Sequence, residues 1–262
     1  MTGFSVDLPD ATLAGEFRRG SGPVPLVLVH GFGGSRHDWD SVVMALGGDT
    51  SIVAYDQRGF GQSRASAGIP FSHADDLAAL LDELALEQVD VCGLSLGGAT
   101  ALELALDKPE RVRRLVLISP MLAGWCWSAE WVELWKEIGR AARAGHLDLA
   151  RMLWWQHPLF ASTRVSSGAT TLEQSIAAYS GRQWVQDDQR SQEPMAQRLA
   201  EVRASILLLT GGLDVPDFRC MADVLQKTVP NIVRVDDPTA GHLLTLERPR
   251  AVATAISDFL GS

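Results

Sequence analysis

The sequence of 262 residues contains few cysteines and no long hydrophobic run. Its three cysteines, Cys92, Cys126 and Cys220, show neither CxxC nor CxxH spacing, so neither a disulfide framework nor a zinc site is expected. The first ten residues, MTGFSVDLPD, lack the basic start and the apolar stretch of a secretory signal. No apolar stretch approaches the roughly 18 residues that a membrane span requires. These absences predict a cytoplasmic protein that has no metal at its site.

Basic residues are also in the minority. The chain has 23 Lys and Arg against 32 Asp and Glu, which gives a formal net charge of −9. Because nucleic acids and anionic membrane surfaces are bound by clustered Lys and Arg, neither is an expected partner. A small molecule is the expected partner, and the composition is compatible with a homo-oligomer.

Apolar runs of strand length alternate with amphipathic segments of helix length. The runs are rich in β-branched residues and mostly continuous rather than alternating, which is typical of strands buried on both faces of a parallel sheet. The order predicts an α/β fold with a mostly parallel, doubly wound sheet and helices on both sides. Residues 11–18 are expected to add an antiparallel hairpin at one edge. The expected strands lie at 26–29, 51–55, 89–93, 115–118, 206–210 and 232–235, and the expected helices at 38–46, 72–86, 95–107, 216–228 and 249–260.

Residues 121–200 break this alternation, because they contain no convincing strand. A segment of this length is too long for a loop, so it predicts a helical cap on a core formed by residues 1–120 and 201–262. All but one of the eight tryptophans fall in the segment. Ordinary packing explains any single one of them, but together they predict an apolar pocket above the sheet. The candidate pocket residues are Trp125, Trp131, Trp135, Trp154, Trp155 and Trp184.

A serine lies between an expected strand and an expected helix, in the segment Gly93-Leu94-Ser95-Leu96-Gly97. The pattern G-x-S-x-G in this setting is typical of a nucleophilic serine on a sharp turn. A positive φ at the serine would bring its neighbours two residues away into contact, where only residues with little or no side chain fit. The alternative is a serine that only caps the helix. The glycine spacing favours the nucleophile.

A serine nucleophile needs a base, and the base needs an acid that holds its tautomer. His242 follows the last expected strand, at the same edge of the sheet as Ser95, and is the predicted base. Asp214 follows the strand at 206–210 and is the predicted acid. The chain order serine, acid, histidine is the order expected on such a sheet. His30 is expected to fix the glycine-rich loop that it starts.

That loop, HGFGGS, follows the expected strand at 26–29. It can turn a backbone N–H toward Ser95, so the N–H groups of Phe32 and Leu96 are the candidate oxyanion donors. A phosphate-binding loop is the alternative, but the sequence contains neither GxxxxGK[ST] nor a GxGxxG with an acidic residue about twenty positions on. No cofactor is expected.

Taken together, HGFGGS, YDQRGFGQS, CGLSLGGATALELAL, PERVRRLVLISP, TGGLDVPD and AGHLLTLERP resemble the α/β-hydrolase superfamily over residues 20–120 and 201–262. The resemblance implies a triad of Ser95, Asp214 and His242, with a structural turn at DQRGFGQS. Its serine makes the chain less similar to the haloalkane dehalogenases and epoxide hydrolases, and CGLSLGG is similar to the enol-lactonases. A menaquinone-pathway lyase would carry an arginine soon after the double glycine, where this chain has Ala99 and Thr100.

The sequence therefore predicts a serine hydrolase that cleaves a carboxylic ester or lactone of a small apolar or aromatic substrate through an acyl-enzyme. A carbon–carbon bond hydrolase, a cofactor-free perhydrolase and a non-enzymatic small-molecule receptor with the same fold are the alternatives. An arginine of the cap facing the pocket would favour an acidic substrate, although a solvated surface is the commoner place for arginine. The arginines in question are Arg140, Arg143, Arg151, Arg164 and Arg182.

Overall fold

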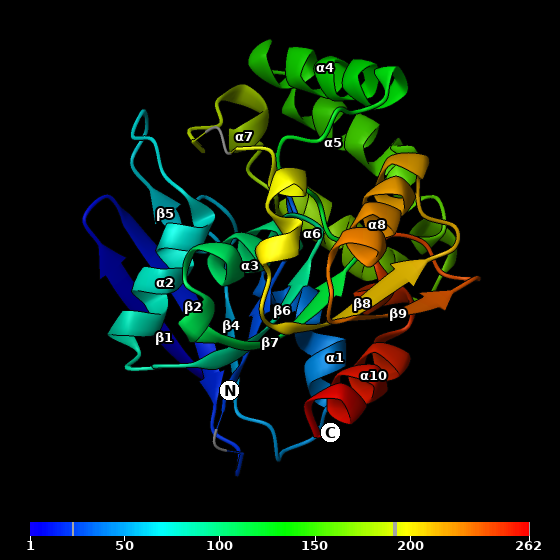
Figure 1. The fold of residues 1–262 in the computed structure, drawn as a ribbon. Coiled ribbons are helices and arrows are strands. Elements are labelled where there is room, and N and C mark those ends of the chain that lie inside the picture. The colour runs from blue at the N-terminus through cyan, green and yellow to red at the C-terminus, as the bar shows by residue number, and fades with distance from the viewer. Residues whose placement is uncertain (23, 191–192, 262) are drawn as a thin grey trace.

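One twisted sheet runs through the molecule (Figure 1). The structure, a computed structural model, describes residues 1–22, 24–190 and 193–261. In these residues nine strands form the sheet, in the order β1-β2-β4-β3-β6-β7-β8-β9, with β5 paired to β2 beside this path. All pairs from β4 to β9 are parallel, which confirms the predicted α/β architecture. The strands are β1 (Thr2–Leu8), β2 (Ala11–Arg18), β3 (Leu26–Val29), β4 (Ile52–Tyr55), β5 (Arg64–Ala65), β6 (Val89–Leu94), β7 (Val112–Ile118), β8 (Ser205–Gly211) and β9 (Ile232–Asp237).

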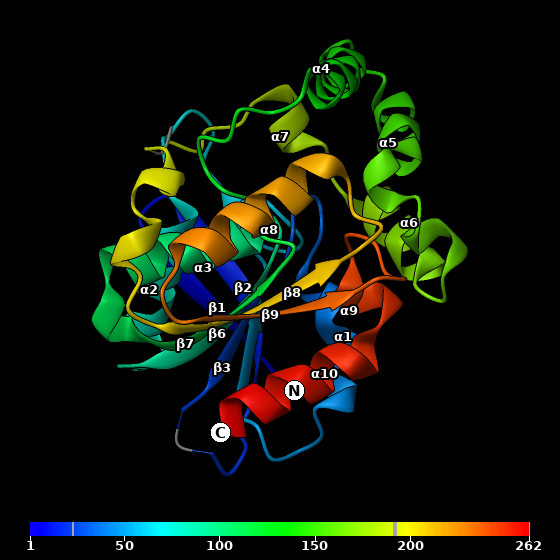
Figure 2. The same ribbon diagram turned by 45° about the vertical axis from the view of Figure 1, so that its right-hand side comes forward.

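Helices cover both faces of the sheet, as Figure 2 shows. Alternate residues of β3 point to opposite faces, so Val27 and Val29 pack into one core and Leu26 and Leu28 into the other. The first core contains α2, α3 and α8, and the second contains α1 and α10. In the described ranges, no helix combines the length and the hydrophobicity that a bilayer crossing needs. These helices, with the short α9, are α1 (Asp40–Ala45), α2 (His73–Glu83), α3 (Leu96–Asp107), α8 (Pro216–Thr228), α9 (Leu244–Glu247) and α10 (Pro249–Gly261).

The antiparallel edge differs from its expected form. Residues 11–18 are a single strand, β2, and the hairpin partner is β1. In β1 the side chains of Phe4, Val6 and Leu8 face inward while the residues between them are exposed. An alternating strand that is buried on one face only lacks the continuous apolar run that marks the central strands.

Between β7 and β8 the chain leaves the sheet. Residues 121–200, called the insertion below, form helices that lie above the carboxyl ends of the parallel strands (Figures 1 and 2). A single β-bridge between Phe71 and Gln189 ties the end of the insertion to the segment before α2. The helices of the insertion are α4 (Ala129–Arg143), α5 (Leu147–Gln156), α6 (Ala169–Ala178) and α7 (Arg182–Val185).

Candidate active site

Ser95 occupies the turn between β6 and α3 with φ 53° and ψ −113°, which confirms the predicted positive φ. The flanking glycines cannot carry a side chain, because the backbone packs closely against both of them. A Cβ at Gly93 would lie 2.2 Å from the backbone oxygen of Gly97, and one at Gly97 would lie 2.2 Å from the oxygen of Val29. Since α3 begins at Leu96, directly after the serine, the positive end of the helix dipole lies beside the hydroxyl.

The close approach at Gly97 predicts a stability effect. In Gly97→Ala the new methyl group must displace the backbone of β3, so we expect the free energy of unfolding to fall by about 3 kcal/mol. Urea denaturation measures the change. Gly48→Ala is the matched control, because no atom lies within 4 Å of its Cβ position, and its effect should stay within about 0.5 kcal/mol. Equal stabilities of the two variants would contradict the packing argument.

Asp214 and His242 meet on two loops that follow β8 and β9. The Nδ1 of His242 lies 2.9 Å from the Oδ2 of Asp214, and both side chains are almost completely buried. The other carboxylate oxygen accepts the backbone N–H of Val215 at 2.7 Å. Because the carboxylate accepts a hydrogen bond from Nδ1–H, it fixes the tautomer in which Nε2 is free to accept a proton.

Ser95 and His242 line the same cavity, which has a volume of about 490 Å³. In the described part of the chain no hydrogen bond joins the Ser95 hydroxyl to the imidazole. Catalytic hydrogen bonds are often long or misaligned in a ligand-free enzyme and tighten when substrate binds. A proton transfer between Ser95 and His242 would require the two groups to approach more closely in a substrate complex.

Two backbone N–H groups beside the serine have no acceptor among the residues that the structure describes. Neither the amide of Phe32 nor that of Leu96 donates a hydrogen bond to any described residue. The carbonyl of Gly31 accepts hydrogen bonds from the Gly34 N–H at 3.2 Å and from His30 Nδ1 at 2.7 Å. Since a trans peptide is planar, holding this carbonyl also fixes the direction of the Phe32 N–H.

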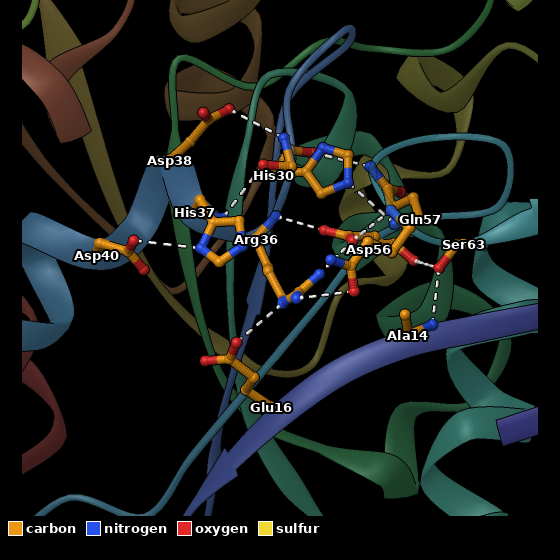
Figure 3. Close-up of polar contacts among 12 residues, drawn as sticks. Ala14, Glu16, His30, Arg36, His37, Asp38, Asp40, Asp56, Gln57 and Ser63 are labelled. Atoms are coloured by element: carbon orange, nitrogen blue, oxygen red, sulfur yellow. Dashed lines mark hydrogen bonds and ion pairs between the residues drawn. The ribbon is translucent and has the colours of Figure 1, made fainter. Parts of the chain in front are cut away.

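Hydrogen bonds with Gln57 hold His30 in place, as Figure 3 shows. Its Nε2 accepts the backbone N–H of Gln57 at 2.9 Å, and the amide of Gln57 donates to the carbonyl oxygen of His30 at 2.8 Å. These bonds confirm that His30 fixes the glycine-rich loop. Nearby, the buried carboxylate of Asp56 accepts the backbone N–H groups of Arg36 and Gln62 and pairs with the Arg36 guanidinium (Figure 3). The segment DQRGFGQS thus forms the structural turn behind the loop.

Aromatic side chains form most of the cavity wall. Of the predicted pocket residues, Trp131, Trp135 and Trp154 line the cavity. Trp127 lines it too, although the sequence did not single it out for the pocket. It stacks on Trp131 with ring centroids 4.3 Å apart, and Trp135 packs edge-on against Phe32 at 5.0 Å.

The other three predicted pocket residues do not line the cavity, which corrects the expectation. The Nε1–H of Trp125 donates a hydrogen bond to the carboxylate of Asp217 at 3.1 Å. Trp155 is next to Trp154 on α5, and neighbouring helix positions point in different directions, so it lies on the outer side of the insertion. Trp184 is buried behind the wall, against Trp154 and the ring of Tyr179.

None of the five arginines considered for a substrate carboxylate lines the cavity. Each is engaged elsewhere, so the predicted route to an acidic substrate has no support. Their guanidinium groups donate to backbone carbonyls: Arg140 to Lys136, Arg143 to Trp184, Arg151 to Tyr179, Arg164 to Trp155 and His157, and Arg182 to Ala65 and Ser66.

Two carboxylates, Glu247 and Asp217, join the core to the insertion near the site. The sequence did not connect either of them to the site. Glu247 is buried and accepts hydrogen bonds from the Gly241 N–H, next to His242, and from the hydroxyls of Ser162 and Thr163 in the insertion. Asp217, on α8, accepts the N–H and the hydroxyl of Ser128, the N-cap of α4. Both carboxylates lie in segments that resemble the family, TGGLDVPD and AGHLLTLERP, but these segments do not show which residues of the insertion the carboxylates contact.

Two further histidines are buried close to the cavity. Burial, with the nearby His30 and Arg58, lowers the pKa of His73 to about 3. Burial also lowers the pKa of His157 to about 4, with smaller contributions from His242 and Arg164. Both imidazoles are therefore neutral at pH 7. Within residues 1–22, 24–190 and 193–261, no group of three or more His, Cys, Asp or Glu side chains is placed to hold a metal ion.

Several proteins are similar to this chain. A protein of Bacillus subtilis (strain 168), provisionally named 2-succinyl-6-hydroxy-2,4-cyclohexadiene-1-carboxylate synthase, is 29% identical over 90% of this chain and 90% of its own. The pimeloyl-[acyl-carrier protein] methyl ester esterase of Nitrosomonas europaea (strain ATCC 19718) is 29% identical over 88% of this chain and 92% of its own. The crystal structure of carboxylesterase CesB (YbfK) from Bacillus subtilis matches with a TM-score of 0.78 and 26% identity, covering 99% of this chain and 92% of that chain.

The sequence model of one family, described as the alpha/beta hydrolase fold, matches residues 24–249. The match includes the sheet from β3 to β9, the insertion and all three residues of the candidate triad. The chain therefore belongs to the α/β-hydrolase fold family, a family of hydrolases.

Proposed function

We propose that this protein is a serine hydrolase that cleaves a carboxylic ester or lactone of a small apolar or aromatic substrate. The observation that carries the proposal is the convergence, on one cavity, of the strained Ser95 and the His242–Asp214 pair. The unpaired amides of Phe32 and Leu96 and the apolar wall add to it. In this proposal the insertion acts as a cap that keeps water away from the reacting groups.

The reaction proceeds in two steps. As the Ser95 oxygen bonds to the substrate carbonyl carbon, its proton passes to Nε2 of His242, and Asp214 stabilises the imidazolium. The N–H groups of Phe32 and Leu96 stabilise the negative oxygen of the tetrahedral intermediate. The carbon–oxygen bond to the alcohol then breaks, and the alcohol leaves with the proton from His242. Water, activated by the same imidazole, releases the acid from Ser95.

Ester cleavage is favoured over the synthase activity in the name of one relative. Two of the similar proteins are an esterase and a carboxylesterase by name. After the double glycine this chain has Ala99 and Thr100, both buried, and the Thr100 hydroxyl donates to the amide oxygen of Gln57. These side chains belong to the core and not to the cavity wall, where a substrate carboxylate would need a cation.

A labelling and turnover experiment tests the proposal. We expect a fluorophosphonate probe to label the protein rapidly, and we expect turnover of p-nitrophenyl esters or aryl lactones with apolar acyl groups. Mass spectrometry should place the label on Ser95, and Ser95→Ala should remain unlabelled. Labelling without turnover of any ester or lactone would overturn the proposal in favour of a receptor. Consumption of a vinylogous diketone with little ester activity would replace it with carbon–carbon bond hydrolysis.

A further inference from the structure

Four polar side chains outside the proposed catalytic group gather in one part of the cavity wall. They are His73, Gln183, Asp187 and Gln189, called the polar subsite below. The β-bridge at Phe71 brings them together: Phe71 accepts the Arg190 N–H at 2.8 Å and donates its own N–H to the Asp188 carbonyl at 3.2 Å. The Phe71 ring in turn packs against His73 with centroids 4.9 Å apart.

The ring of Phe60 lies between His73 of the polar subsite and Phe32 of the glycine-rich loop. Phe60 lies 6.0 Å from His73 and 5.6 Å from Phe32, measured between ring centroids. Trp135, on α4, packs against Phe32 with ring centroids 5.0 Å apart. A substrate whose carbonyl lies beside the Phe32 N–H can thus extend an apolar body along these rings and place its far end in the polar subsite.

His73 has unused hydrogen-bonding capacity at this point. The residue is 2% exposed, and its Nδ1 is buried without a partner. Its Nε2 makes no hydrogen bond with any described residue and, unlike Nδ1, is not completely buried. Because His73 lines the cavity, Nε2 is the ring nitrogen that is open to it. In a neutral imidazole Nε2 either donates or accepts, according to the tautomer.

The two glutamines add further capacity. Gln183 is held in place because its Oε1 accepts the Tyr179 hydroxyl at 2.8 Å and its Nε2 donates to the Gly59 carbonyl at 3.3 Å. One N–H of this amide is left over. The side-chain amide of Gln189 makes no hydrogen bond with the described residues.

The charges around the polar subsite argue against a carboxylate group at this end of the substrate. His73 is neutral at pH 7, Asp187 is acidic and no arginine lines the cavity. Lys136, the cationic side chain of the described cavity wall, is paired with Glu133 at 2.8 Å. An ammonium group could donate to the Asp187 carboxylate, but it could not accept from the remaining N–H of Gln183, so it matches the polar subsite less completely than a hydroxyl does. A hydroxyl both donates and accepts, so it matches either tautomer of His73.

The geometry points to a substrate that combines an apolar body with an uncharged hydroxyl group, the body lying along Phe32 and Phe60 and the hydroxyl in the polar subsite. This inference rests on the proposed function for the orientation of the substrate, whose ester lies at Ser95. It makes His73 and Gln189 determinants of substrate specificity.

The test measures binding apart from turnover. Ser95→Ala is titrated with phenyl esters of graded chain length, each ending in a methyl, a hydroxymethyl or a carboxylate group, and binding is followed by quenching of tryptophan fluorescence. At the best length we expect the hydroxyl ester to bind about tenfold more tightly than the methyl ester. Adding His73→Phe should reduce this preference to about twofold or less, with little change for the methyl ester.

Matched variants make the result decisive. His146→Phe changes an exposed histidine outside the cavity and should keep the full preference. Gln189→Met removes a second polar group without changing a buried position, and serves if His73→Phe does not fold. A preference that is absent at every length, that persists in both subsite variants, or that favours the carboxylate would overturn the inference. Failure of the ester hydrolysis proposal would appear separately, as lack of turnover by the unmodified protein on the same esters.

Discussion

Replacing Ser95 with alanine is expected to lower kcat for the best ester substrate by about 10⁶-fold, the size of effect typical of a removed serine nucleophile. Asp214→Asn is expected to cost about 10⁴-fold, because the amide can hold His242 in the wrong tautomer. KM should change little in either variant, since the aromatic wall that binds the substrate remains. Steady-state rates on the same ester provide the measurement.

A second strained serine supplies the control for this prediction. Ser119 follows β7, the strand beside β6, and has a φ of 40°. It is buried, its hydroxyl has no hydrogen-bond partner in the described part of the chain, and it does not line the cavity. Ser119→Ala should therefore keep nearly full activity. Retention of more than about a tenth of the activity in Ser95→Ala, well short of the loss expected for a nucleophile, would remove this serine from the proposed role.

The fold was predictable to the extent that it depends on local patterns. The continuous apolar runs marked every central strand, and Pro216 at the first turn helped to place α8 at the predicted residues 216–228. The strand β1 was missed because its inward residues alternate with exposed ones. Helix α1 is shorter than the predicted segment 38–46, since Arg36–Trp39 form a separate 3-10 turn capped by Ser35.

The site was predictable where a short segment determines the geometry. The glycines around Ser95 define the turn by their own contacts, and the positions of Asp214 and His242 follow from the ends of two strands. The direction in which a side chain of the insertion points depends on how its helix packs. The sequence therefore led to the same prediction for the adjacent residues Trp154 and Trp155, although only Trp154 lines the cavity. The contact of Glu247 with Thr163 joins residues 84 positions apart, which no local pattern records.

Acid is expected to destabilise the protein through two of its buried histidines, His73 and His157. Burial is the main cause that lowers the pKa of His73 to about 3 and that of His157 to about 4, while both have ordinary values near 6.5 in the unfolded chain. Between these values the unfolded chain binds more protons than the folded one, so stability falls as the pH drops below 6.5. From pH 7 to pH 5 each histidine should remove about 2 kcal/mol from the free energy of unfolding.

Glu103 acts in the opposite direction, so the histidine effect has to be isolated by substitution. Burial, with Asp107 and Asp75 nearby, raises the pKa of Glu103 to about 7, and a carboxyl that gains its proton earlier in the folded state adds stability as the pH falls. Urea denaturation at pH 7 and pH 5 should therefore be compared between the unmodified protein and His73→Phe/His157→Phe. The double variant should lose about 4 kcal/mol less over this interval, whereas His146→Phe should not differ from the unmodified protein. An equal loss in the double variant would show that both imidazoles become protonated without unfolding, which is incompatible with the buried, unpartnered nitrogens that each of them carries.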